Sequence, residues 1–240
     1  MLELVVIAIG TAFATGLGAI PVFLLGPRAE KLRPALLGIA AGVMGVAAVA
    51  GLLEPALDDG SVGTVAAGCL AGVLFLVAAR RALVPEGTQA ALRARRMSVL
   101  VFAVLFVHSL PEGLALGTAY ASTVEGLAAF IVIAISVQNI PEGTSVAIPM
   151  EAAGYSARRQ FWAAVGTSAP QPVGAVIAYL AVDHVEGLLP LSFAFAAGAM
   201  LALVVVELLP EGLRANRRGA LTGTALGAAG MLALSLALGV

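Results

Sequence analysis

The feature that most constrains this chain is a series of long apolar segments with few polar residues inside them. A helix needs about 20 mostly apolar residues to cross a bilayer, and eight segments of the 240-residue chain meet this requirement. Membrane strands are shorter, about 10 residues, and alternate in polarity, so they do not fit these continuous runs. The sequence predicts an all-α, polytopic membrane protein with a single transmembrane domain over residues 1–240. The expected helices are 2–25, 35–57, 62–83, 97–120, 126–149, 161–182, 188–211 and 219–240.

The composition supports this class. Hydrophobic residues make up 60% of the chain and charged residues 11%, against about 25% charged residues in soluble domains. No basic stripe with interleaved aromatic residues is present, so nucleic acid is not an expected partner. The single cysteine, Cys69, excludes an intrachain disulfide and a thiolate metal cage. The first segment lacks the basic start of a cleaved signal peptide, so we expect it to be a retained helix.

The charged residues between the segments predict the orientation. In an eight-helix layout all 13 Lys and Arg residues fall on one side, and positive charge marks the cytoplasmic face. We therefore expect a multi-pass protein of the cell membrane with both termini outside. The basic residues are Arg28, Lys31, Arg33, Arg80, Arg81, Arg93, Arg95, Arg96, Arg158, Arg159, Arg214, Arg217 and Arg218. The opposite side carries Glu3, Asp58, Asp59, Glu125, Asp183 and Glu186.

Pairs of glycines four residues apart recur in three segments. Such pairs let helices approach closely in lipid. We expect ordinary packing between helices of one chain, and a homodimer interface is the alternative. The pairs are Gly38/Gly42, Gly68/Gly72 and Gly223/Gly227.

Two short stretches nearly repeat each other, and they are the strongest functional signal. His108-Ser109-Leu110-Pro111-Glu112-Gly113 lies in the segment 97–120, and Gln138-Asn139-Ile140-Pro141-Glu142-Gly143 lies in 126–149. Each places a metal-binding side chain four residues before a glutamate, which puts both on the same face of a helix. Carboxylates at membrane depth are costly and are functional by default.

The proline of each stretch predicts a kink. Pro111 and Pro141 have no N–H to donate to the preceding turn, and such interruptions are tolerated in a membrane where the backbone is buried or lines a wet cavity. We expect two kinked helices at the core, with polar residues converging at mid-bilayer.

This set of side chains suits a divalent transition metal. One imidazole, two carboxylates and amide oxygens are ligands for zinc, and also for iron(II), manganese or cadmium. Two facing carboxylates repel each other unless a cation lies between them. For His108 alone, a hydrogen bond to a neighbouring helix is an equal alternative.

With these motifs the chain resembles the ZIP (Zrt-, Irt-like) family of divalent metal transporters. The resemblance implies an elevator-type transporter rather than an enzyme, with the metal as the transported ion and no catalytic cofactor. Four residues match the primary metal site by position: His108, Glu112, Gln138 and Glu142. Two match ligands of a second site that some members have: Ser109 and Asn139.

Two positions depart from the family pattern, Ser109, which stands where asparagine is common, and Gln171. The segment 161–182 usually contributes a glutamate before a proline, whereas Gln171 stands there in Ala169-Pro170-Gln171-Pro172. Because Gln171 carries no charge, we expect one well-occupied ion rather than two. A remaining ligand role for Gln171 and a simple hydrogen bond between helices are equal alternatives.

For the other acidic residues, each role has an alternative. By resemblance, Glu207 and Glu211 could line a cytoplasmic exit, whereas Glu54 and Glu211 fit equally well as acids that reach the membrane interface. The cluster Asp183-His184-Val185-Glu186 fits a solvated loop better than a cation entrance. The loop 84–96 has no histidine, unlike many members, so we expect no metal sensing there.

Two other classes of function are open alternatives. One is an intramembrane metal-dependent hydrolase, because His and Glu can hold zinc and activate water. The other is a membrane subunit that binds metal without transporting it. Expected partners are therefore the metal cation, the lipid bilayer and, as an alternative, a second copy of the chain.

Overall fold

The computed structural model describes the backbone of residues 1–83, 94–185 and 187–240. These residues form helices and contain no strand, which confirms the all-α prediction. Two predictions lie outside the described residues: the one on the loop, including Arg93, and the one on Glu186. The helices are α1 (Leu2–Leu17), α2 (Ile20–Leu25), η1 (Gly26–Lys31), α3 (Arg33–Ala48), η2 (Val49–Leu53), α4 (Glu54–Asp59), α5 (Val62–Leu83), α6 (Ala94–Ala121), α7 (Leu127–Ala152), α8 (Ala157–Thr167), α9 (Pro170–His184), α10 (Leu188–Leu203), η3 (Val204–Leu208) and α11 (Leu209–Leu238).

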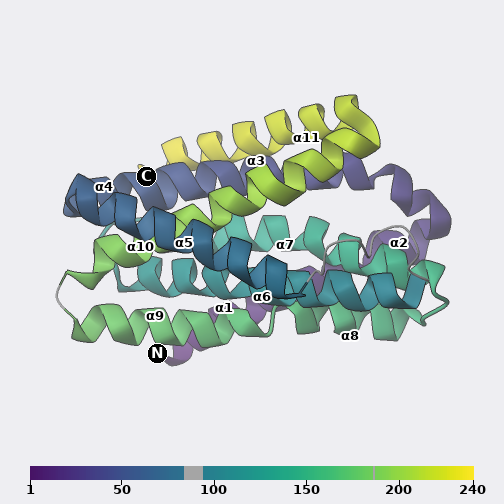
Figure 1. The fold of residues 1–240 in the computed structure, drawn as a ribbon, viewed down its shortest axis with the longest axis horizontal. Coiled ribbons are helices and arrows are strands. Elements are labelled where there is room, and N and C mark those ends of the chain that lie inside the picture. Colours follow the sequence, from purple (N-terminus) through teal and green to yellow (C-terminus); the bar gives the residue numbers. More distant parts are fainter. Residues whose placement is uncertain (84–93, 186) are drawn as a thin grey trace.

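Within the described residues, seven helical stretches are long and apolar enough to cross a membrane. We predicted eight, and the difference lies in one stretch of 51 residues, Leu188–Leu238. At Asn216 in this stretch, φ is −160° and ψ is 102°, which is not helical. Figure 1 shows that α11 turns back on itself in this region.

Breaks in the helices occur at places other than the two motif prolines. The first stretch is interrupted at residues 18–19, between α1 and α2, and the sixth at residues 168–169, between α8 and α9. In contrast, α6 continues through Pro111 and α7 continues through Pro141. These prolines therefore do not end their helices, and the predicted kinks stay a prediction. Two π-helices, η2 and η3, each end two residues before a proline, Pro55 and Pro210.

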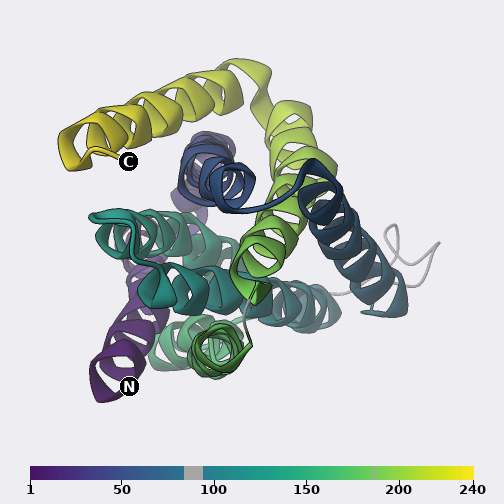
Figure 2. The ribbon, with the colours of Figure 1, turned by 90° about the vertical axis from the view of Figure 1, so that its left-hand side faces the viewer.

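The helices form two groups, of which one occupies the lower left part of Figure 2 and the other lies above it and to its right. One group contains α1, α6, α7 and α9, and the other contains α3, α5, α10 and α11. Glycines bring helices of one group together. A side chain at Gly42 would overlap the carbonyl group of Thr224 in α11, and one at Gly223 would overlap that of Ala35 in α3. The predicted glycine pairs thus pack within the chain.

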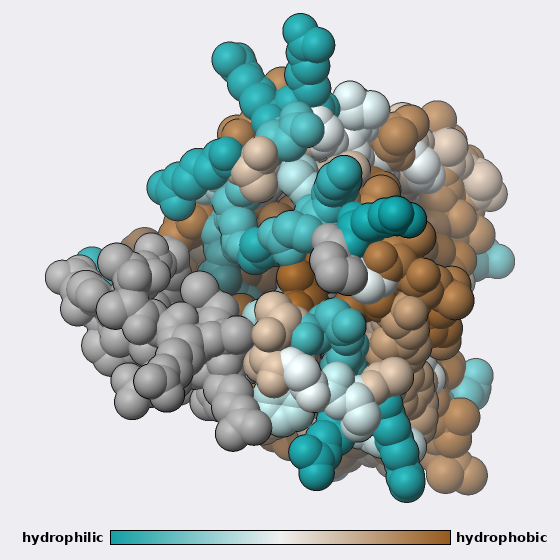
Figure 3. Space-filling view, turned by 90° about the vertical axis from the view of Figure 1, so that its right-hand side faces the viewer, coloured by the Kyte–Doolittle hydropathy of each residue, from teal (hydrophilic) through white to brown (hydrophobic). Residues whose placement is uncertain are grey.

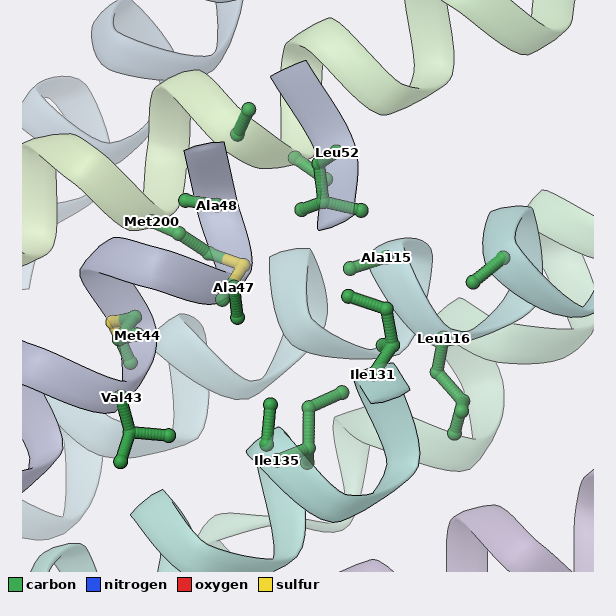
Figure 4. Close-up of a cluster of buried hydrophobic side chains, with 14 of the residues drawn as sticks. Val43, Met44, Ala47, Ala48, Leu52, Ala115, Leu116, Ile131, Ile135 and Met200 are labelled. Carbon is green, nitrogen blue, oxygen red and sulfur yellow. The ribbon is translucent and has the colours of Figure 1, made fainter. Parts of the chain in front are cut away.

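The contact between the two groups includes a large apolar cluster. Met44, Ala47 and Leu52 of α3 and η2 belong to the same buried cluster as Ile131 and Ile135 of α7. Figure 4 shows these side chains together with their neighbours from α6 and α10. The α6 and α7 helices that carry the motif stretches thus pack against the other group through hydrocarbon side chains at this cluster.

The two ends of the molecule differ in charge. Both termini lie at the end that is on the left in Figure 1, whereas η1, the start of α8 and the turn within α11 lie at the other end. Exposed arginines such as Arg28, Arg158 and Arg217 belong to these latter segments. Figure 3 shows that hydrophilic side chains gather at this end, next to apolar flanks.

Candidate metal site

The residues of the two repeated stretches are buried in the middle of α6 and α7. His108, Ser109 and Glu112 of α6 are between 1% and 3% exposed. Gln138, Asn139 and Glu142 of α7 are at most 2% exposed, and Gln171 of α9 is 0% exposed. All seven predicted site residues are thus removed from lipid as well as from water.

The Glu112 carboxylate is at the centre of this polar region. Its Oε1 accepts a hydrogen bond from Nε2 of Gln138 at 2.6 Å, and its Oε2 accepts one from Nε2 of Gln171 at 2.5 Å. Hydrogen bonds to a charged acceptor are stronger than neutral ones. Glu112 therefore ties α6 to α7 and to α9.

The side of the site towards Gln138 and Glu142 has unused acceptors. Oε1 of Gln138 and Oε1 of Glu142 are buried and have no hydrogen-bond partner. The Glu142 carboxyl lies close enough to Glu112 and Glu207 for electrostatic interaction with both. Unpaired buried acceptors are costly, and a cation is the group that would satisfy oxygens of this kind.

A second set of contacts extends the site to α1. The side chain of Asn139 donates from Nδ2 to the carbonyl group of Thr11 at 2.7 Å. The hydroxyl of Thr11 donates to Oε1 of Gln171 at 3.2 Å. One turn further along, the hydroxyls of Thr15 and Ser168 are 2.6 Å apart. Four helical stretches, α1, α6, α7 and α8–α9, therefore meet in one hydrogen-bonded network.

Small residues make this convergence sterically feasible. A side chain at Gly113 would overlap the backbone carbonyl of Gln171, and one at Gly143 would overlap that of Thr15. Both glycines directly follow the glutamates of the repeated stretches. They let α9 approach α6 and let α1 approach α7 at the level of the carboxylates.

His108 and Ser109 also contact groups outside the two motifs. Nε2 of His108 lies 3.7 Å from Oε2 of Glu207, which belongs to η3 in the other group. The hydroxyl of Ser109 donates to the carbonyl group of Leu105 at 3.1 Å. Within the described part of the chain, no three His, Cys, Asp or Glu side chains are gathered closely enough to hold a metal ion. A metal site here therefore depends on amide oxygens as well.

The network contains residues that the sequence did not single out. Thr11, Thr15 and Ser168 were missed, although each is at most 2% exposed. Thr11 and Thr15 are four residues apart and thus share a helix face, which is a weak signal because hydroxyls in apolar helices often bond to their own helix. Thr118 and Ser136 do so, donating to carbonyls four residues earlier.

The remaining acidic residues differ in their surroundings. Glu211 pairs with Arg33, which also contacts Glu30 at 3.4 Å. Glu54 is exposed, and Glu207 has a side chain that is 21% exposed. Glu211 is thus part of a charged group at the basic end.

Comparison with known proteins adds independent evidence. The model of the family described as ZIP zinc transporter matches residues 79–235, which is more than half of the chain. The chain belongs to the ZIP zinc transporter family. The zinc transporter GufA of Myxococcus xanthus is 34% identical over 241 residues, covering 94% of this chain and 95% of GufA.

Other relatives are longer than this chain. A protein of Arabidopsis thaliana is 36% identical over 214 residues, which are 85% of this chain and 33% of that protein. Human zinc transporter ZIP11 is 31% identical over 152 residues, 60% of this chain and 44% of ZIP11. This ZIP chain thus spans nearly all of GufA but less than half of these two relatives. Membership of the family and the apolar helices identify it as a multi-pass membrane protein from a family of metal transporters.

Proposed function

We propose that this ZIP protein carries a divalent transition-metal cation, zinc in the first place, across the cell membrane towards the cytoplasm. The observation that carries the proposal is a buried polar network at the Glu112 carboxylate, inside helices that are otherwise apolar. Buried carboxylates are costly in a bilayer, and a divalent cation offsets that cost. The names of GufA and ZIP11 as zinc transporters agree with zinc as the cargo. Iron, manganese and cadmium accept the same ligand types.

The ion is proposed to bind between α6 and α7. Oε1 of Gln138 and Oε1 of Glu142 have no hydrogen-bond partner, and Glu112 lies beside both side chains. His108 is one helical turn before Glu112 and would supply a nitrogen ligand. Ser109 and Asn139 are proposed as neighbouring polar groups rather than as ligands of this first ion. Thiolates are absent from the set, which favours release of the ion.

The chain is proposed to cross the membrane eight times. Asn216 lies between the predicted segments 188–211 and 219–240, and α11 turns back there (Figure 1). This division adds one crossing to the seven stretches and agrees with two termini at the same end. The other end carries the exposed arginines, so it is proposed to face the cytoplasm.

Transport is proposed to occur by an elevator-type movement of one helix group against the other. The group of α1, α6, α7 and α9 is held together by the polar network and by close backbone contacts at Gly113 and Gly143. Its contact with the other group includes apolar side chains such as Met44, Ile131 and Ile135, which have no directional bonds to break.

Uptake by the purified full chain in liposomes tests this function. We expect zinc to accumulate inside, and we expect Glu112→Ala and Glu142→Ala each to abolish uptake while the protein stays in the membrane. The control is Glu151→Ala, because Glu151 is on α7 but accepts its hydrogen bond from Gln160 at 2.6 Å, outside the network. Normal uptake by both site variants would contradict the site. Zinc binding without uptake would favour a non-transporting subunit, and hydrolysis by the solubilised protein would favour a hydrolase.

A further inference from the structure

Both ends of the Gln171 side-chain amide are hydrogen-bonded. Nε2 donates to Oε2 of Glu112 at 2.5 Å and to Oδ1 of Asn139 at 3.3 Å. Oε1 accepts from Nδ2 of Asn139 at 3.3 Å, and it lies 3.2 Å from the hydroxyl of Thr11, whose single proton also has the carbonyl oxygen of Ala8 at 2.9 Å. A side-chain amide has two N–H donors and an oxygen with two lone pairs. Asn139 therefore holds both ends of this amide, and the NH2 group, which cannot bind a cation, occupies the side that faces Glu112.

The orientation of this amide follows from its neighbour. An ionised carboxylate only accepts hydrogen bonds, so the NH2 group of Gln171, and not its oxygen, must face Glu112. The opposite side of Glu112 is different, because Oε1 of Gln138 and Oε1 of Glu142 are unpartnered there. NH2 groups of Gln138 and Gln171 thus face the two oxygens of Glu112, but the buried acceptors without a hydrogen-bond partner at this site lie on the side of Gln138 and Glu142.

A carboxylate at position 171 would change the side of Glu112 that faces Gln171. Two oxygens would then face Oε2 of Glu112, with the side-chain oxygens of Thr11 and Asn139 next to them. In this variant, oxygens from four side chains would surround a space that the NH2 group of Gln171 no longer fills. Facing carboxylates favour a cation between them, and oxygen-rich sites with carboxylates suit divalent metals.

We infer that Gln171 is a positioning residue whose amide group takes the place of a second cation beside Glu112 and thereby limits the site to one ion. This inference rests on the proposed metal-transport function and names the number of ions bound. Gln171 also joins α9 to α1, α6 and α7 through Thr11, Glu112 and Asn139. The Glu112 carboxylate therefore keeps its position when the transported ion has left.

The test is the number of zinc ions bound per chain, measured by metal analysis of the purified full chain in detergent after equilibration with buffered zinc. We expect one ion for the unchanged chain and two for Gln171→Glu. The matched control is Gln160→Glu, because Gln160 is also 0% exposed and also donates to a glutamate, Glu151, at 2.6 Å. We expect this control to bind one ion, since Gln160 lies outside the network.

A second variant addresses the positioning role. Gln171→Ala removes the donor to Glu112 without adding a charge, so we expect one bound ion with an affinity lowered about 10- to 100-fold, as for residues that orient metal ligands. A merely structural role would lower the yield of folded protein but would not raise the ion count to two in Gln171→Glu.

The outcomes separate the inference from the proposed function. One ion in the unchanged chain and also one in folded Gln171→Glu would overturn the inference and leave the proposed function standing. Two ions in the unchanged chain would likewise overturn the inference. No zinc bound by the unchanged chain would overturn the proposed function itself. If Gln171→Glu folds only when zinc is present and then holds two ions, the inference is supported.

Discussion

Replacing Glu112 by glutamine is expected to weaken zinc binding strongly while keeping the shape of the side chain. Both carboxylate oxygens of Glu112 accept hydrogen bonds from NH2 groups, at 2.5 Å and 2.6 Å. In Glu112→Gln one oxygen becomes an NH2 group that faces another NH2 group, and the site loses a negative charge. Loss of one partner in a buried, hydrogen-bonded charge pair costs about 2–5 kcal/mol. Since 1.4 kcal/mol corresponds to a tenfold change, Kd for zinc is expected to rise about 30- to 4,000-fold.

The assay is competition for zinc between the purified protein in detergent and a zinc-sensitive dye. The matched control is Glu151→Gln, which changes a carboxylate of α7 that also accepts from an amide, Gln160, at 2.6 Å. We expect the control to keep the Kd of the unchanged chain. If folded Glu112→Gln also kept this Kd, Glu112 would not be a ligand, and the assignment of the site to the α6–α7 contact would be refuted.

Three other predictions concern thermal unfolding, two on contacts between helices and one on added metal. Gly42→Leu is expected to lower the free energy of unfolding by about 1–3 kcal/mol and to lower Tm, because the new side chain would overlap the carbonyl group of Thr224. At Gly45 nothing lies within 4 Å of an added side chain, so an equal loss of stability in Gly45→Leu would contradict this reason. Thr144→Val removes a 2.7 Å hydrogen bond to the carbonyl group of Gly18 and is expected to cost about 0.6–1.7 kcal/mol, so an unchanged Tm would show that α1 and α7 do not need this bond. Zinc at a hundred times its Kd is expected to stabilise the protein by about 2.7 kcal/mol, whereas Mg²⁺, which keeps water ligands, should leave Tm unchanged.

The class of fold was predictable because its cause is local. In lipid, a backbone without water must satisfy its own hydrogen bonds, and long apolar segments therefore form helices. Eight crossings stay a prediction, which rests on the distribution of the charged residues. The helical stretch Leu188–Leu238 continues past the turn, and the departure from helical geometry is confined to Asn216.

The positions of the helix breaks were only partly predictable. Gln171 lies between two prolines inside the expected helix 161–182, and α9 begins at the first of them, Pro170. Pro111 and Pro141 carry the same local signal, yet α6 and α7 continue through them. The first stretch breaks at residues 18–19, where Gly18 lies against the carbonyl group of Ile140 in α7. The local sequence alone therefore does not predict where a helix breaks, because packing between helices also contributes.

The candidate site was predictable as a set of residues but not as a set of contacts. The repeated motif identified Glu112, Gln138 and Glu142 because its spacing places them on helix faces. The bond from Gln171 to Glu112 depends on how closely α9 approaches α6, which is set by Gly113. The contact between His108 and Glu207 joins two helix groups and has no counterpart in the spacing of either motif.

The central claim is that a divalent cation binds between α6 and α7 at the two glutamates. The most direct test is an anomalous difference map, recorded at the zinc absorption edge, from crystals of the zinc-loaded full chain. The account predicts one strong peak within bonding distance of the carboxylates of Glu112 and Glu142. A strong peak elsewhere in the molecule, with none between these two side chains, would contradict it.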